Sequence, residues 1–298
     1  MSQLKLAILI PSIGESSAFT LFKSIVDSLQ SGNFLLRHQM QVLMLVSSCS
    51  KDHIEQYRLS HHTIYYTTKK YGASKARNKL ARLSIAPYIL FCDADSQISD
   101  KIEFPTAMNT LLCKLDFLSE KDVIIFNNTK KTLVRLSPFR FRLTEWNFLV
   151  SRQLFISSRG FPDKIGVGAL NICQSGEAQF LFNIFYKSKV RFFEYPQIFV
   201  HPSLGSLNEY QELHNEGKLL TYNIGASYAT LFNLIFNLSR LSIFHAACFA
   251  LNTLFFLPLR CLINLLYLRV IQGRVQGALI ALQEIVIARR KIVNLYDC

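Results

Sequence analysis

Two aspartates, Asp93 and Asp95, directly follow an apolar run that is expected to form a strand over 88–92. Alternate residues of a strand point to the same side, so the two carboxylates can converge on one site where the strand ends. Carboxylates at close range repel each other unless a cation lies beside them, and Mg²⁺ or Mn²⁺ prefers such oxygen ligands. The pair therefore predicts a divalent-metal site at which phosphate oxygens complete the coordination shell. Taken alone, the same residues are equally consistent with a capped turn that opens the next element.

A second candidate site lies upstream, where a Gly-Ala-Ser sequence leads into a helix expected over 73–83. The first turns of this helix carry Ser74, Arg77 and Asn78. A helix N-terminus with a nearby cation can bind a phosphate group. A helix cap followed by a solvated arginine is the commoner origin of such a sequence. The loop Pro11–Glu15 after the first strand has one glycine, which argues against a dinucleotide site of the G-x-G-x-x-G type.

Two later residues are further candidates. Glu177 stands at the start of a helix expected over 178–187, where a carboxylate could act as a general base. The alternative is an ordinary first-turn glutamate, which the helix dipole favours. His201 follows a strand-like segment and could supply a third metal ligand as a neutral imidazole. The alternative is a plain turn residue before proline.

Short apolar runs and helical patterns alternate over the first 200 residues, which is typical of an α/β sheet. The expected strands are 4–10, 40–46, 88–92, 123–126, 146–150 and 190–193. The expected helices are 16–29, a short one ending at Glu55, 73–83, 102–118 and 178–187. We expect Pro11 to end the first strand. The elements predict an α/β domain over 1–205, followed by a polar linker at 206–218.

The remaining segment, 219–298, is very apolar and carries seven of the basic residues but two of the acidic ones. Residues 241–259 have no charge and are bracketed by Arg240 and Arg260, a length that suits a membrane span. A single crossing would send the basic run 289–291 to the far side, against the positive-inside tendency. A helical hairpin in the cytoplasmic leaflet avoids this conflict. A helical subdomain packed on the sheet is the alternative.

The overall charge and the cysteines restrict the partners and the compartment. Of the net charge of +13, residues 219–298 carry +5, with their arginines at the edges of apolar runs and almost no acids, which favours a membrane surface over nucleic acid as the partner. The seven cysteines are scattered, without a C-x-x-C pair, which argues for reduced thiols and against a disulfide framework or a cysteine zinc site. The N-terminal sequence has no secretory signal pattern, so we expect the protein on the cytoplasmic side of the plasma membrane.

Taken in order, these segments resemble the family 2 glycosyltransferases, which are inverting enzymes with the GT-A nucleotide-sugar-binding fold. The resemblance covers roughly residues 4–205 and includes Pro11-Ser12, Gly72–Asn78 and the D-A-D-S of the third strand. It continues through the segments 146–152, 161–169 and 175–177 and the strand that ends at His201. The linker and the apolar tail, with the sequence G-R-V-Q-G at 273–277, are similar to bacterial members that build surface polysaccharides.

The resemblance implies a metal-dependent transfer of sugar from a nucleotide-diphosphate donor, a UDP-sugar, to a lipid-linked or surface-glycan acceptor. The positions that would hold the base and ribose are Pro11, Ser12, Ser74, Arg77 and Asn78. Asp93 would reach the ribose or the metal, and Asp95 would coordinate the Mn²⁺ or Mg²⁺ ion that bridges the diphosphate. His201 matches the late metal-binding histidine of the family. Glu177 lies in the segment that supplies the catalytic base.

The chain departs from the family pattern at three points. Ser47 follows the second strand where an acidic residue that contacts uracil is usual, and Arg159-Gly160 replaces a usual Gly-Gly. Ala178 replaces the second residue of an acidic pair. The last departure leaves open a catalytically weakened scaffold in a polysaccharide-assembly complex. A sugar nucleotidyltransferase is a further alternative, but the loop after the first strand lacks the Lys or Arg that it needs.

Overall fold

The computed structural model describes residues 4–31, 38–56, 61–127, 134–136, 148–162, 177–196, 198–200, 219–236, 239–261 and 265–288. The chain divides into two units, the first with residues 1–160 and 189–202, the second with residues 161–188 and 203–298. The second unit thus contains residues 161–188, which the sequence interpretation assigned to the α/β domain. The expected linker at 206–218 lies outside the described residues, and the predicted domain boundaries stay a prediction.

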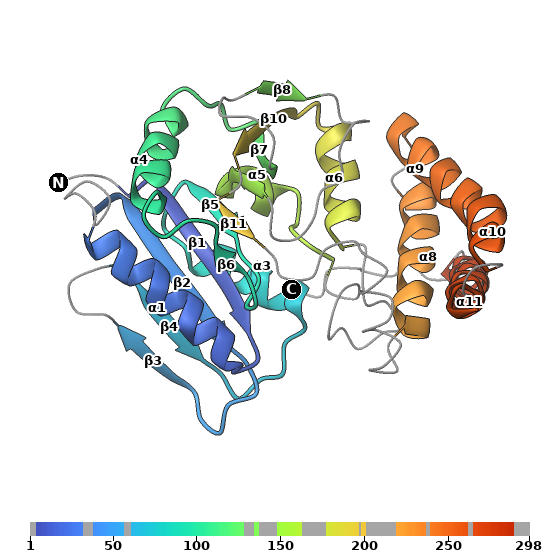
Figure 1. Cartoon of the computed structure of the whole chain (residues 1–298), viewed down its shortest axis with the longest axis horizontal. Helices are drawn as coiled ribbons and strands as arrows, with labels where there is room; N and C mark the ends of the chain where they lie inside the picture. The colour runs from blue at the N-terminus through green and yellow to red at the C-terminus, as the bar shows by residue number, and fades with distance from the viewer. Residues whose placement is uncertain are drawn as a thin grey trace. The chain divides into compact units, whose positions relative to one another are not determined.

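The first unit is built on a mixed sheet whose described strands run in the order β3-β4-β2-β1-β5-β9-β7-β10-β8 (Figure 1). The pairs β1–β2, β1–β5, β2–β4 and β7–β10 are parallel, and the other neighbours are antiparallel. The strands are β1 (Leu6–Ser12), β2 (Met40–Val46), β3 (His53–Gln56), β4 (Thr63–Tyr66), β5 (Tyr88–Phe91), β7 (Asp122–Asn127), β8 (Val134–Leu136), β9 (Phe148–Ser151) and β10 (Arg191–Pro196). A small second sheet pairs β6 (Gln97–Ile98) with β11 (Phe199–Val200).

Helices cover both faces of the central strands, which is why β1 and β2 are buried along their whole length and apolar except at Ser12 and Gln41. The helices α1 (Ser16–Ser31) and α4 (Phe104–Leu115) share one core with Leu6, Ile8 and Ile10 of β1. On the other face, α3 (Ala73–Leu83) packs on β1, and α5 (Arg152–Ser157) packs on β5. The predicted α/β fold with a mixed sheet and flanking helices is confirmed.

Pro11 lies inside β1 and does not end it, contrary to the sequence interpretation. The neighbouring strand β5 pairs with β1 only as far as Leu9, whose carbonyl accepts a hydrogen bond from the Cys92 amide over 3.0 Å. Alternate residues of a strand turn their backbone groups toward the same neighbour, so Pro11 faces the side on which β5 has already ended. Its missing N–H is therefore not needed, and β1 continues beside β2 to Ser12.

The short helix expected to end at Glu55 is wrong, because residues 53–56 form the edge strand β3. This strand pairs antiparallel with β4, and all four of its side chains are exposed. The ring of His53 stacks on that of Tyr66 with a centroid separation of 3.8 Å. Pairing with β4 and this cross-strand ring contact stabilise residues 53–56 as a strand. Neither interaction requires alternating apolar residues, so the sequence lacks the pattern that predicts a strand.

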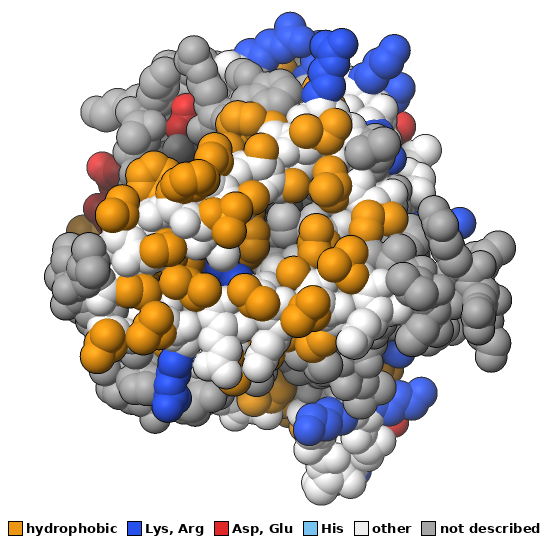
Figure 2. Space-filling model, turned by 90° about the vertical axis from the view of Figure 1, so that its right-hand side faces the viewer, with side chains coloured by type: hydrophobic (Ala, Val, Ile, Leu, Met, Phe, Trp, Pro, Cys, Tyr) orange, Lys and Arg blue, Asp and Glu red, His pale blue; other side chains and the backbone are white. Residues whose placement is uncertain are grey.

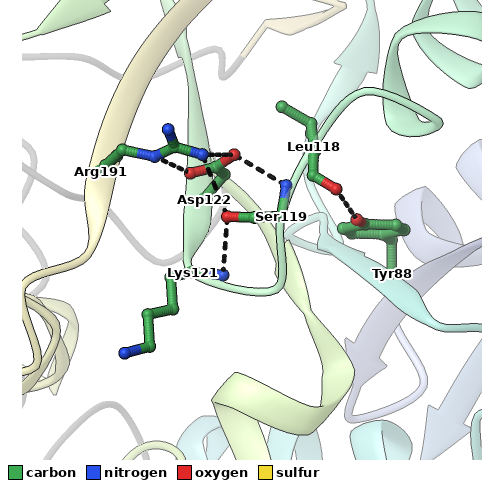
Figure 3. Close-up of polar contacts among 6 residues, drawn as sticks. All are labelled: Tyr88, Leu118, Ser119, Lys121, Asp122 and Arg191. Carbon is green, nitrogen blue, oxygen red and sulfur yellow. Dashed lines mark hydrogen bonds and ion pairs between the residues drawn. The ribbon is translucent and has the colours of Figure 1, made fainter.

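A polar cluster fixes the starts of β7 and β10 at the edge of the sheet opposite the strand ends described below (Figure 3). The buried carboxylate of Asp122 accepts hydrogen bonds from Arg191 Nε at 2.7 Å and Nη2 at 2.8 Å, and from the Ser119 amide at 2.8 Å. Nearby, the Tyr88 hydroxyl donates to the Leu118 carbonyl over 3.2 Å, and burial raises the pKa of Tyr88. Such bidentate, charge-assisted pairing satisfies a carboxylate that would be costly to bury alone.

The second unit is helical in its described residues. It contains α6 (Glu177–Lys187), α8 (Leu219–Phe236), α9 (Arg240–Leu251), the π-helical turn η1 (Asn252–Phe256), α10 (Leu257–Cys261) and α11 (Leu266–Ala288). The helices α8 and α11 cross closely at Gly273 and Gly277 of α11. A Cβ atom added at Gly277 would lie 2.2 Å from the carbonyl oxygen of Ile224 in α8. Small residues four positions apart are what allow two helix backbones to approach so closely.

Arg274 connects three helical segments of the second unit. Its guanidinium donates from Nη1 to Asn252 Oδ1 and Thr253 Oγ1, each at 2.9 Å, and its Nε lies 3.4 Å from Asn223 Oδ1 of α8. The same group lies 4.4 Å from the ring centre of Phe249 in α9, within cation–π range. Three polar side chains of these apolar helices, Asn223, Asn252 and Thr253, are therefore gathered around one arginine.

One helical stretch among the described residues is long and apolar enough to cross a membrane, Arg240–Cys261, which comprises α9, η1 and α10. It contains the charge-free run 241–259 noted in the sequence.

Candidate active site

The carboxyl ends of β1 and β5 lie side by side. Leu9 of β1 is level with Phe91 of β5 in this parallel pair, so Ser12 and Asp93 both leave the sheet at the same edge. Ligands of open α/β sheets bind at this edge, outside the carboxyl ends of the strands.

The loop after β1 is closed by a side-chain network around Glu15. One carboxylate oxygen of Glu15 accepts hydrogen bonds from the Ser12 hydroxyl and from the Ile13 amide, each at 2.7 Å. The Ser12 hydroxyl in turn accepts from the Gly14 amide at 2.9 Å, and Gly14 has a φ of 100°, which favours glycine. The sequence interpretation missed Glu15. The Ser-x-x-Glu spacing before a helix, which is typical of reciprocal side-chain bonds, was the signal available.

The loop after β2 is tied to the loop after β1. The Ser47 amide and hydroxyl both donate to the Ser12 carbonyl, at 3.0 Å and 3.3 Å, and both serines are buried. Asp52, the acid nearest to the end of β2, accepts a hydrogen bond from the Thr68 amide, which lowers its pKa. The carboxylate of Asp52 is therefore engaged in holding the β3–β4 region, and a serine stands directly at the end of β2.

Arg77 and Asp93 form an ion pair at the centre of the candidate site. Arg77 Nη2 donates to Asp93 Oδ1, and the side chain of Arg77 is 5% exposed against 21% for Asp93. The two residues come from different elements, the first half of α3 and the end of β5. Ser74 and Asn78 lie on the same helix and are buried. The structure thus brings together Arg77 and Asp93, two of the candidate residues named from the sequence.

Asp95 follows two residues later and is exposed, while the backbone from Asp93 to Ser96 forms a turn with a 3.0 Å hydrogen bond. Burial strongly raises the pKa of the neighbouring Cys92 thiol, so this cysteine stays protonated and is a poor metal ligand. Among the described residues, no group of three or more His, Cys, Asp or Glu side chains is arranged to hold a metal ion. Two carboxylates with solvent access nevertheless fit Mg²⁺ or Mn²⁺, which take few protein ligands when phosphates supply the others.

Asn78 is held against the turn that follows α5. Gly160 has a φ of 66°, and a Cβ atom added there would lie 2.4 Å from Asn78 Oδ1 and 2.9 Å from the Phe155 ring. Arg159 also has a positive φ, of 64°, a backbone conformation that glycine adopts more readily than arginine does. The chain therefore departs from the usual Gly-Gly at residue 159 but keeps glycine at residue 160, where there is no room for a side chain.

The structure brings Ser12, Arg77, Asn78 and Asp93 onto the first unit, on or beside neighbouring strand ends. Glu177 is the first residue of α6, as expected, and belongs to the second unit. His201, the predicted third metal ligand, lies outside the described residues.

Comparison with known proteins gives the family of the segment 35–174 and the fold. The model of glycosyl transferase family 2 matches residues 35–174, which include α3, Asp93 and Asp95. No curated protein matches the sequence at a significant level.

Solved structures share the architecture at low sequence identity. The mannosyltransferase PcManGT from Pyrobaculum calidifontis, in complex with GDP-Man and Mn²⁺, is 12% identical; the alignment covers 98% of this chain and 81% of that chain, with a TM-score of 0.57. Residues 1–349 of S. aureus TarS, in complex with UDP, are 15% identical over 94% of this chain and 92% of that chain, with a TM-score of 0.51. The alignment to a longer TarS chain covers 44% of it. The family match over residues 35–174, together with this shared fold, identifies this part of the chain as a family 2 glycosyltransferase domain of the GT-A type.

Proposed function

We propose that this glycosyltransferase moves a sugar, with inversion, from a nucleotide-diphosphate donor to a lipid-linked or surface-glycan acceptor in polysaccharide biosynthesis. The observation that carries the proposal is the Arg77–Asp93 ion pair beside Asp95 at the carboxyl ends of β1 and β5. This arrangement combines a cation for phosphate with carboxylates for a metal ion or ribose hydroxyls.

The donor would bind along the edge formed by the β1 loop and α3. Pro11 and Ser12 would contact the base and ribose, with Ser74 and Asn78 on the helix beside them. Arg77 is fixed by Asp93, so its position does not depend on the ligand, and preorganised groups lose little entropy on binding. A UDP-sugar is the favoured donor. GDP-Man is bound in PcManGT and UDP-GlcNAc in a TarS structure, so both UDP-sugars and GDP-sugars should be tested as donors.

A divalent cation, Mn²⁺ or Mg²⁺, would be held by Asp95 with Asp93, and His201 is the proposed third ligand. The cation would supply charge neutralisation for the leaving diphosphate. Arg77 would keep one oxygen of Asp93 occupied and thereby orient the other oxygen. The Mn²⁺ bound in PcManGT supports the choice of a divalent metal in this fold.

Glu177 is the proposed general base. It would accept the proton of the acceptor hydroxyl while that oxygen attacks the sugar from the face opposite the diphosphate. Its place at the first residue of α6 is one at which the helix dipole favours a carboxylate. A general base contributes about 10²–10⁴-fold to the rate, so its loss should affect turnover far more than donor binding.

The alternative function is that of a non-catalytic scaffold that retains the fold in a polysaccharide-assembly complex. Ala178, which directly follows Glu177, is the observation that favours it, because a second acid is absent from this segment. We further propose that the protein acts on the cytoplasmic side of the plasma membrane, where the apolar helices hold it near an acceptor that cannot leave the bilayer. Attachment to the same surface raises the effective concentration of such a substrate.

The experiment that tests the function measures donor hydrolysis and transfer with UDP- and GDP-sugars in the presence of Mn²⁺. We expect Glu177→Gln to lower turnover by about 10²-fold or more while donor affinity is retained. Glu120→Gln, at an exposed turn, is the matched control and should leave both unchanged. Donor binding without turnover in the wild-type chain would support the scaffold, and the absence of donor binding would refute the transferase.

A further inference from the structure

The second unit exposes large apolar side chains that no neighbouring element covers in the described structure. Within Arg240–Cys261, which we name the apolar helix, Leu254, Phe255 and Phe256 are 67%, 60% and 56% exposed. Leu251 and Leu259, one turn away on either side, are 51% and 62% exposed. Soluble monomers rarely expose apolar patches of this extent, so the surface indicates an interaction site.

The helix α11 adds to the same surface. Leu268, Val275, Leu279 and Leu282 recur at helical spacing and are 51–54% exposed. The opposite side of α11, with its two glycines, packs against α8. Figure 2 shows hydrophobic side chains spread over this face of the molecule, which is formed by the apolar helix and α11. We name this surface the apolar face.

The charges around the apolar face indicate what covers it. Arg240, Arg260 and Arg269 are exposed on the same helices. From residue 219 to residue 283 the sequence contains no aspartate or glutamate. A protein partner would usually meet a mixture of charges, whereas apolar side chains edged by arginine complement acyl chains beneath anionic head groups.

The contacts of Arg274 decide how deep the apolar helix can lie. Arg274 binds Asn252 and Thr253, which are near the middle of the apolar helix. If this helix crossed the bilayer, the guanidinium would lie near the bilayer centre, where an arginine is costly. In one leaflet, the long side chain remains within reach of the head-group region.

We propose that the apolar face inserts into a single leaflet of an anionic bilayer, with the apolar helix and α11 lying along the membrane surface and neither one crossing it. The proposal rests on the proposed function, since it specifies how the enzyme meets a lipid-linked acceptor. The helix α6, which begins with Glu177, packs on α8 and α9 within the same unit, where the ring of Phe182 lies 6.0 Å from that of His245. Insertion of the apolar face therefore brings the helix of the proposed base to the surface on which the acceptor resides.

The first test is flotation of the full chain with vesicles of phosphatidylcholine, with and without phosphatidylglycerol. We expect binding to the anionic vesicles that falls about tenfold or more in neutral ones. Phe255→Glu should lower binding about tenfold or more, because it replaces an inserted ring with a charge. Phe117→Glu, which changes a ring 88% exposed on the first unit, is the matched control and should bind like the wild type.

The second test measures depth by bromolipid quenching of a single tryptophan, introduced at Phe244, near one end of the apolar helix, or at Leu251, near its middle, in a Trp146→Phe background. These sites are 7 residues apart, which corresponds to about 10 Å along a helix, so a helix that crossed the bilayer would place Leu251 clearly deeper than Phe244. Equal, shallow depths would support insertion into one leaflet, and clearly different depths would overturn it in favour of a span.

Absence of flotation, or a dimer in solution that Phe255→Glu dissociates without any vesicle binding, would also overturn the proposal. Calorimetric donor binding by the same variants separates this outcome from failure of the proposed function. We expect Phe255→Glu to bind donor like the wild type, whatever its membrane affinity.

Discussion

His62 is buried immediately before β4, and its protonation should weaken the fold. It is 1% exposed, and its Nδ1 accepts a hydrogen bond from the Val42 amide of β2 over 3.1 Å. Burial, with a smaller contribution from the charge of His61, lowers the pKa of His62 from 6.5 to about 4. A protonated ring would lose its acceptor nitrogen and carry a charge into a buried site.

The sign and size of the effect follow from the two pKa values. The unfolded chain binds a proton at this group below its pKa of 6.5, whereas the folded chain does so only near 4. The stabilisation is therefore present above 6.5 and is lost as the pH falls from 6.5 toward 4. Between about pH 7 and about pH 5 the free energy of unfolding should fall by about 2 kcal/mol from this group alone.

The assay compares urea denaturation at these two pH values for the wild type and His62→Asn. The asparagine oxygen can accept from the Val42 amide, as Nδ1 does, but it does not titrate. We expect the variant to be less stable near pH 7, because it fills less space, and to show a pH dependence about 2 kcal/mol smaller than that of the wild type. His61→Asn removes an exposed histidine and should keep most of the wild-type dependence. Equal pH dependence in the wild type and His62→Asn would refute the reasoning.

Three further substitutions test packing and pairing, each by the free energy of unfolding. Gly160→Ala should cost about 2–4 kcal/mol, because the residue has a φ of 66° and its Cβ would meet Asn78 Oδ1 at 2.4 Å; the displaced Asn78 should also weaken donor binding. Asp122→Asn should cost about 1.5–3 kcal/mol, because the charge-assisted pair with Arg191 is lost. Gly277→Ala should destabilise the second unit by about 1–3 kcal/mol, because the new methyl group meets the backbone of α8 at 2.2 Å.

Each of these three predictions would be contradicted by a different result. A stabilising Gly277→Ala, by about 1 kcal/mol, is what helix propensity alone gives, and it would mean that α8 and α11 do not cross tightly. A Gly160→Ala variant with unchanged stability and donor affinity would show that Asn78 is not constrained by the turn. An Asp122→Asn variant as stable as the wild type would mean that solvent satisfies Arg191 equally well.

Much of the first unit could be predicted because the local hydrophobic pattern of each element indicates a strand or a helix. The buried strands β1 and β2 are apolar except at Ser12 and Gln41, and α3 carries a clear helical pattern. The edge strand β3 could not be recognised, because its four exposed side chains give no alternation. Pro11 misled the interpretation, because whether its missing N–H matters depends on where the neighbouring strand ends.

The candidate site was predictable as a set of residues, but its contacts were not. The motif around Asp93 and Asp95 and the helix entrance at Ser74 identify the region. The ion pair between Arg77 and Asp93 arises only when α3 packs on the sheet, and sequence separation does not reveal it. The role of Glu15 in closing the β1 loop depends on backbone geometry at Gly14. The packing of α6 on α8 and α9 is likewise a tertiary feature.

The most direct test of the central claim is calorimetric binding of UDP and GDP to the full chain, with and without Mn²⁺, in the wild type and Asp95→Asn. Asp116→Asn is the matched control, because it changes an exposed carboxylate that pairs with Lys5 at the start of β1, at the opposite edge of the sheet. We predict Mn²⁺-dependent binding that Asp95→Asn abolishes and Asp116→Asn retains. Failure of the folded wild-type chain to bind either nucleotide, or binding that is indifferent to both Mn²⁺ and Asp95, would contradict a metal-dependent donor site at the carboxyl ends of β1 and β5.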